Sequence, residues 1–113
     1  MPAKSLCRQQ SPSALSGEIP PELGNLTSLT ELNLFNNQLT SEIPQELGNL
    51  TNLHVLRVSE NQLTGEIPAG LGNLANLTEL VLNENQLSGC LPSNLIGRLD
   101  DEISDLGGLP FCP

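Results

Sequence analysis

The chain has 113 residues and a formal net charge of −9, with 13 aspartate and glutamate residues against 4 lysine and arginine residues. This length suits one modest domain, and the negative charge, with no Trp or Tyr to stack on bases, argues against nucleic acid as a partner. The same charge disfavours an anionic membrane surface, and no apolar run approaches the roughly eighteen residues that a membrane span requires.

Residues 1–14, "MPAKSLCRQQSPSA", are predicted to form a flexible N-terminal tail. The segment contains Lys4 and Arg8 but lacks an apolar stretch between them and a cleavage site, so no signal peptide is visible. We expect Cys7 in this segment to be a thiol outside any disulfide, with an intermolecular bridge as the alternative.

Residues 15–95 repeat one pattern at a constant period. The unit reads LxGxIPxxLGNLxxLxxLxLxxNx, and its prolines recur at Pro20, Pro44, Pro68 and Pro92. The alternation in Leu32-Asn33-Leu34 predicts a short strand, whereas the proline and glycine of "IPxxLGNL" permit only a short helical turn or irregular coil. Each repeat is therefore interpreted as one coil of a solenoid whose stacked leucines form the core.

An asparagine column follows the predicted strands at Asn37, Asn61 and Asn85. A side-chain amide offers both a donor and an acceptor, so these residues are predicted to satisfy backbone groups at the turn. A ligand-binding amide is the less favoured interpretation.

The stretch "LSGEIPPELGNLTSLTELNLFNNQL" resembles the plant-specific class of leucine-rich repeats, found in ectodomains of plant receptor-like kinases and in polygalacturonase-inhibiting proteins. The resemblance implies an α/β fold: a right-handed solenoid with a parallel concave sheet, a second short sheet near "LTGEI" and 3₁₀ turns on the convex side. It also implies binding in place of catalysis, and an extracellular or cell-surface location. An intracellular location is the alternative, because no signal peptide is visible. The N-terminal cap typical of the family, with a helix, a cysteine pair and a Trp, is missing from this sequence.

Residues 96–113 depart from the period and are predicted to form a C-terminal cap. Cys90 occupies the repeat position of Glu18, Glu42 and Glu66, and Cys112 stands at the end of the cap. A disulfide between the two would pin the cap to the last coil, as the paired cysteines of the family's C-terminal cap also suggest.

Catalytic, metal and cofactor sites are not expected. The only histidine, His54, matches Thr30 and Thr78 in the repeat, which indicates a surface position rather than a general base. Three N-x-[ST] sequons, at Asn25, Asn49 and Asn76, are glycosylation candidates if a eukaryotic source secretes the chain, although the repeat's own "GNL" generates two of them.

The outward-facing strand positions vary most between repeats and are the candidate ligand-binding residues. They are Glu31, Asn33, Phe35, Val55, Arg57, Ser59, Glu79, Val81 and Asn83. Phe35 and Arg57 belong to the residue types that most often dominate binding energy, and the surrounding carboxylates favour a protein or peptide partner with positive charge. Ordinary surface positions are the alternative interpretation of both residues.

Two other functions are weighed against this binding module. One is a self-associating fragment of a longer array, with a homodimer through the uncapped N-terminal end and a monomer as its alternative. The other is ice binding through the ladder Ser16, Thr40, Thr64 and Ser88, which lies beside the glutamate column. That column, Glu18, Glu42 and Glu66, is interpreted as a solvated stripe, with a basic partner or a bound cation as the sharper hypotheses.

Overall fold

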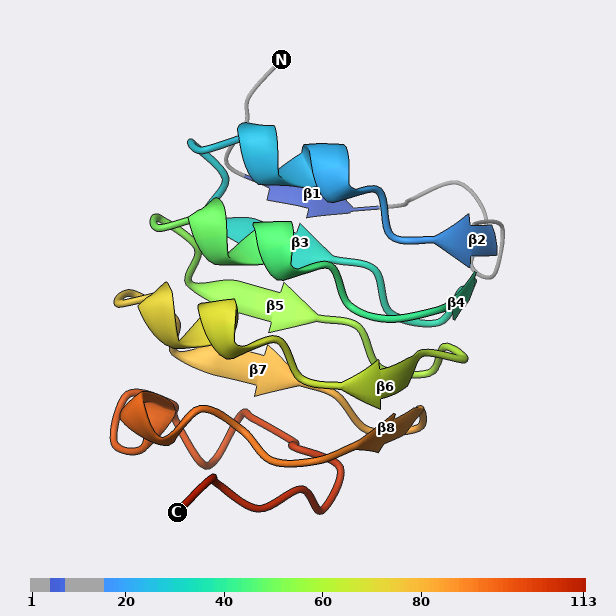
Figure 1. Ribbon diagram of the computed structural model, residues 1–113. Helices are drawn as coiled ribbons and strands as arrows, with labels where there is room; N and C mark the ends of the chain where they lie inside the picture. The colour runs from blue at the N-terminus through green and yellow to red at the C-terminus, as the bar shows by residue number, and fades with distance from the viewer. Residues whose placement is uncertain (1–4, 8–15) are drawn as a thin grey trace.

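The protein is described by a computed structural model that covers residues 5–7 and 16–113. Its coils stack into a solenoid with a parallel sheet on one side and short helices on the other (Figure 1). Within the described residues, the concave sheet has the order β1-β3-β5-β7, formed by Ser5–Cys7, Glu31–Asn33, Val55–Arg57 and Glu79–Val81. This arrangement confirms the predicted solenoid with a parallel sheet and 3₁₀ turns. No helix in the described part of the chain is long and apolar enough to cross a membrane.

The second sheet is divided into two pairs of short strands. β2 (Ser16–Glu18) pairs with β4 (Gln38–Thr40), and β6 (Thr64–Glu66) pairs with β8 (Gln86–Ser88). The register falls two residues short of the sequence period, so that Glu18 lies opposite Thr40 and Glu66 lies opposite Ser88. A shift of two keeps the same face of each strand outward. It also keeps neighbouring glutamates of the column out of direct cross-strand register, where like charges would be destabilising.

Four 3₁₀ helices form the convex side of the described coils. They are η1 (Pro21–Asn25), η2 (Gln45–Asn49), η3 (Ala69–Asn73) and η4 (Ser93–Leu95). A proline precedes each helix and restricts the chain direction at its start, and before η1, η2 and η3 it has an extended conformation. Glycine permits the close packing of consecutive helices, because a Cβ at Gly48 would lie 2.5 Å from the carbonyl oxygen of Gly70.

The core is a continuous stack of leucine side chains. Leu32, Leu56 and Leu80, at the centres of β3, β5 and β7, are completely buried. They pair directly across the sheet, so each coil covers the leucines of the next. One coil alone would leave these side chains in water, which is why the coils are stable only as a stack.

The asparagine column closes the turn after each strand. Asn61 is 8% exposed, and its Nδ2 donates to the carbonyl oxygens of Leu34, Val58 and Ser59 at 3.0–3.1 Å. Its Oδ1 accepts a hydrogen bond from the Leu39 backbone N–H at 3.0 Å. The amide therefore satisfies its own coil and the preceding coil together.

Both ends of the described chain add to the concave sheet. Ser5–Cys7 lies in the range expected to be a flexible tail, yet it forms β1 and pairs in parallel with β3. At the other end Asp105 forms a parallel bridge with Val81. The Cys90–Cys112 disulfide holds the C-terminal segment against the last coil. A parallel β-bridge between Leu91 and Phe111 lies beside it.

One residue departs from the glycine column of the repeat. Gly17, Gly65 and Gly89 have φ angles of 81–83°, and Ser41 holds the equivalent place with φ of 66°. A side chain in this left-handed region is strained, whereas glycine is not. The strain coincides with the break between the β2-β4 and β6-β8 pairs. The stacking of the coils therefore imposes the left-handed conformation at this position, although serine does not favour it.

Asn61→Ala should lower the free energy of unfolding by about 1–3 kcal/mol, because it leaves buried backbone groups without partners. Urea denaturation measures the change. The matched control is Asn52→Ala, which removes an exposed amide that donates to the Thr27 carbonyl oxygen and should cost less than about 1 kcal/mol. Equal losses for the two variants would contradict the buried ladder.

Ser41→Gly should raise the free energy of unfolding by about 0.5–1 kcal/mol, since relief of left-handed strain exceeds the added entropy of the unfolded chain. The reverse exchange, Gly65→Ser, should destabilise, because its Cβ would also lie 2.6 Å from the Cγ of Glu42. A Ser41→Gly protein with unchanged or lower stability would show that Ser41 is not strained.

Opening the Cys90–Cys112 bridge, which closes a 22-residue separation, should cost about 3 kcal/mol of stability. Thiol titration of the unfolded chain should find one thiol without reductant and three with it, since the chain has three cysteines. Three thiols in the absence of reductant would contradict the bridge.

Candidate functional site

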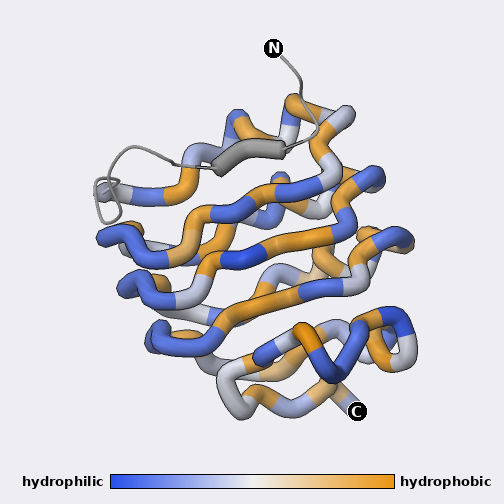
Figure 2. The backbone as a smooth tube through the Cα atoms, turned by 180° about the vertical axis from the view of Figure 1, so that it is seen from behind, coloured by the Kyte–Doolittle hydropathy of each residue, from blue (hydrophilic) through white to orange (hydrophobic). Residues whose placement is uncertain are grey.

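Cross-strand pairing brings most of the sequence-predicted binding residues together on the concave sheet, whose strands lie side by side in Figure 2. Cross-strand pairing aligns Glu31 with Val55 and Glu79, and it aligns Asn33 with Arg57 and Val81. Most of these side chains are half-buried, as residues on a concave surface tend to be. The face is therefore a continuous surface made by three consecutive strands.

Two of the candidate residues are less accessible than the alternation of the strands predicts. Glu79 is 8% exposed and Ser59 is 6% exposed. For Glu79 the cause lies in the neighbouring elements: Arg57 pairs with its carboxylate, and the bridge from Asp105 to Val81 adds chain on its other side. These two residues offer little surface to a ligand.

Arg57 lies between two carboxylates in the centre of the sheet. Its Nε donates to Oε2 of Glu79, and its Nη1 lies 3.7 Å from Oε2 of Glu31. The three residues come from three consecutive strands, and the guanidinium group of Arg57 offsets the two like charges that lie on either side of Val55. We call this group the Glu31–Arg57–Glu79 triad.

The triad gives Arg57 a structural role. Truncating the arginine would leave the Glu79 carboxylate nearly buried without its counter-ion, which is costly. The guanidinium side chain is still 36% exposed, so a ligand carboxylate or carbonyl group has access to it. A binding measurement on an Arg57 variant would mix these two effects.

Phe35 is the most accessible apolar group at this face. It is 49% exposed, and its backbone N–H contacts Oδ1 of Asn33 at 3.4 Å. The following residue, Asn36, has a φ of 61°, and Glu60 and Glu84 repeat that conformation at 58° and 60°. The sheet therefore ends in a uniform turn, with Phe35 beside it.

Asp105 extends the face and was missed by sequence reasoning. Its backbone N–H donates to the Leu80 carbonyl oxygen at 3.0 Å, and its own carbonyl oxygen accepts from the Leu82 N–H at 2.7 Å. Asp105 is exposed and continues the column of Asn33, Arg57 and Val81. The signal was present, because Asp105 lies one full period after Val81, but the surrounding cap no longer matches the repeat.

The three glycosylation candidates lie away from the concave sheet. Asn25 and Asn49 are the exposed last residues of η1 and η2. Asn76 is exposed in the turn after η3, where its Nδ2 donates to the Thr51 carbonyl oxygen at 3.1 Å. Glycans at these positions would leave the sheet face open.

Comparison with known proteins places this geometry among leucine-rich repeats. The family model described as Leucine Rich repeats (2 copies) matches residues 27–69 and 51–110. No curated protein matches the chain at a significant level.

Solved structures with the same fold include three plant receptor proteins. The complex of the plant peptide hormone receptor RGFR1 with RGF2 has a TM-score of 0.78 and 45% identity, over 86% of this chain and 16% of that one. The Arabidopsis thaliana GASSHO1/SCHENGEN3 ectodomain, in complex with CASPARIAN STRIP INTEGRITY FACTOR 2, has a TM-score of 0.71 and 45% identity over 75% and 10% of the two chains. The Arabidopsis thaliana BIR2 ectodomain has a TM-score of 0.72 and 35% identity over 86% and 51%. The chain thus spans between a tenth and about half of these proteins.

Proposed function

The chain belongs to the leucine-rich repeat family, and on that premise we propose that it is a non-enzymatic binding module whose concave sheet holds an extended peptide or a protein segment. The observation that carries the proposal is the continuous outward face of β3, β5 and β7, where the residues differ between coils while the stacking residues do not. The RGFR1 and GASSHO1/SCHENGEN3 structures, which contain RGF2 and CASPARIAN STRIP INTEGRITY FACTOR 2, support it by analogy.

The proposed contact surface centres on Phe35 and the exposed part of Arg57. An exposed aromatic ring and a guanidinium group are common sources of binding energy. Exposed carboxylates at Glu60, Glu84 and Asp105 line the edges of the face, so a partner with positive charge near its ends fits best.

The width of the face limits the size of the partner. Three strands at about 4.8 Å spacing offer roughly 10–15 Å of sheet, which suits a peptide or a loop better than a large globular surface. We also propose an extracellular or cell-surface location, as for the ectodomains to which the chain is similar.

Neither alternative function gains a specific observation. The ice-binding ladder is interrupted, because Thr40 lies opposite Glu18 and Ser88 lies opposite Glu66. The homodimer expectation depends on an end of the chain that lies mostly outside the described residues, and β1 pairs with the edge of β3 there.

The test is to select ligands for the whole chain from a random linear peptide library and to measure their dissociation constants by calorimetry. Phe35→Ala should weaken binding by about tenfold or more, equivalent to at least about 1 kcal/mol. The matched control is Ile96→Ala, which truncates another exposed apolar side chain on the C-terminal segment and should change the constant less than about twofold.

NMR chemical shifts of the backbone amides, measured on isotope-labelled protein, locate the binding site of the peptide. A selected peptide should shift resonances of β3, β5 and β7 more than those of η1, η2 and η3. Equal losses for Phe35→Ala and Ile96→Ala, or shifts confined to the helices, would place the ligand elsewhere and contradict the proposal.

A further inference from the structure

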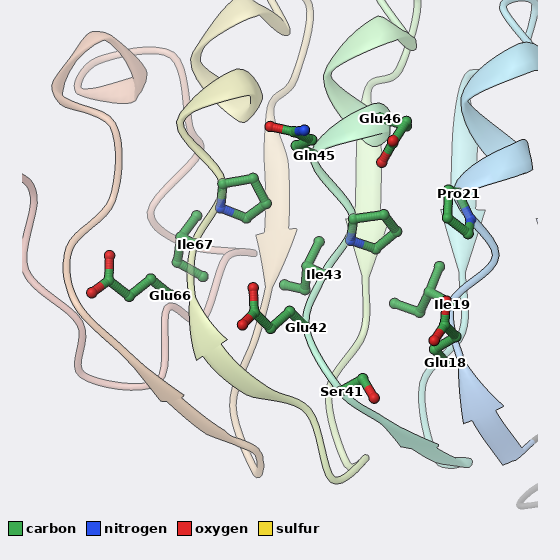
Figure 3. Close-up of a pocket in the computed structure, with 12 residues that line it drawn as sticks. Glu18, Ile19, Pro21, Ser41, Glu42, Ile43, Gln45, Glu46, Glu66 and Ile67 are labelled. Carbon is green, nitrogen blue, oxygen red and sulfur yellow. The ribbon is translucent and has the colours of Figure 1, made fainter.

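A groove of about 710 Å³ runs across three coils between the second sheet and the 3₁₀ helices (Figure 3). The repeated Glu-Ile-Pro segments line it, together with the start of η2, and we call it the Glu-Ile-Pro groove. Its volume is within the range of ligand-binding clefts. It belongs to a different side of the solenoid from the concave sheet.

The inner wall of the groove is apolar. Ile19, Ile43 and Ile67 form its floor and are 1–7% exposed, so they pack into the core and offer little surface themselves. Pro44 and Pro68 lie beside them and are half-buried. Proline has no backbone N–H, so this part of the wall offers carbon surface without donors.

The rim of the groove is acidic. Glu18, Glu42 and Glu66 lie in a row on successive coils and are exposed, as Figure 3 shows, and Glu46 adds a half-buried carboxylate. No lysine, arginine or histidine is among the described residues that line the groove. Both salt bridges found in the described residues use Arg57 of the concave sheet instead.

Glycines of the following coil hold this row in place. A Cβ at Gly65 would lie 2.6 Å from Cγ of Glu42, and a Cβ at Gly89 would lie 3.1 Å from Cγ of Glu66. The Glu42 and Glu66 stems therefore pack over glycines, whereas Ser41 holds the equivalent position in the coil after Glu18. A bulkier residue at either glycine would displace them.

The carboxylates are spread along the groove rather than gathered at one point. No group of three His, Cys, Asp or Glu residues within the described ranges is close enough to hold a metal ion. A single small cation is therefore a poor match. A chain that carries several separate positive charges matches the row better.

We propose that the Glu-Ile-Pro groove docks an extended, proline-rich segment of another protein that carries several separated basic residues. Such a segment adopts the extended polyproline II conformation, which rises about 3.1 Å per residue, so its basic residues stay apart. Its separated charges match a row of carboxylates that are also kept apart, since the register pairs Glu18 with Thr40 rather than with Glu42. Basic side chains on one edge of such a segment meet the carboxylates while its prolines contact the half-buried Pro44 and Pro68.

Fluorescence polarisation of the whole chain with a labelled Arg-Pro-Pro-Arg-Pro-Pro-Arg peptide tests the proposal. Glu42→Gln and Glu66→Gln should each weaken binding by about three- to tenfold. The matched control Glu102→Gln removes an exposed carboxylate of the C-terminal segment, outside the groove lining, and should change binding less than about twofold. Phe35→Ala should have no effect, which separates this site from the proposed concave site.

A peptide of the same composition with its three arginines together should bind at least about threefold more weakly. Equal binding of the two peptides, or equal losses for Glu42→Gln and Glu102→Gln, would show only diffuse attraction to an acidic chain and overturn the proposal. Displacement of the peptide by millimolar Ca²⁺ but not by equal ionic strength of NaCl would identify a cation site instead. Self-association abolished by Glu42→Gln would assign the groove to a second copy of the chain.

Discussion

Stacking of one coil on the next is the constraint on which the rest of this structure depends. The strands are three residues long and cannot bury their leucines or satisfy their backbone groups alone. Hydrogen bonds therefore leave each coil for its neighbour, as when the Leu34 N–H donates to the Arg57 carbonyl oxygen at 2.7 Å. Asn61 links two coils with one amide, since it binds Leu34 and Leu39 of the preceding coil. The sequence repeats because each coil must place the same leucines and hydrogen-bonding groups against its neighbour.

The same constraint produces the charge pattern of the concave sheet. Identical positions of successive coils lie opposite one another there, so identical charges would repel across each strand pair. Val55 lies between Glu31 and Glu79 in this register, and Arg57 contacts the carboxylates of both. Much of the charge on this face is thus engaged within the protein. The groups left to a ligand are mainly those near the sheet's end, where Phe35 is exposed.

The stacked features could be predicted because burial has a period. Leucines one period apart predicted the strands, the core and the convex turns, and the match to the family model confirms the repeat assignment. A period does not fix a register, since it places Glu18 beside Glu42, whereas the strands pair Glu18 with Thr40. The burial of Glu79 was not predictable either, because it depends on the pairing of Asp105 in a segment that has otherwise lost the repeat. β1 has three residues and no repeat signature, so composition alone suggested a tail.

The two long faces of the solenoid treat their carboxylates differently, and this difference bears on function. The concave sheet neutralises its own glutamates through Arg57, whereas the groove presents four glutamates and no basic residue among those described in its lining. Protection against edge pairing does not explain the row, because β4 and β6 face each other inside the stack, where the Gln62 and Thr64 N–H groups donate to the Leu39 and Ser41 carbonyl oxygens. Packing does not require the charge either, since the Glu42 and Glu66 stems lie over glycines, where another flexible side chain would also fit. The groove carboxylates are therefore available to attract positive charge from a ligand. Because they recur on successive coils, the attraction extends along the groove.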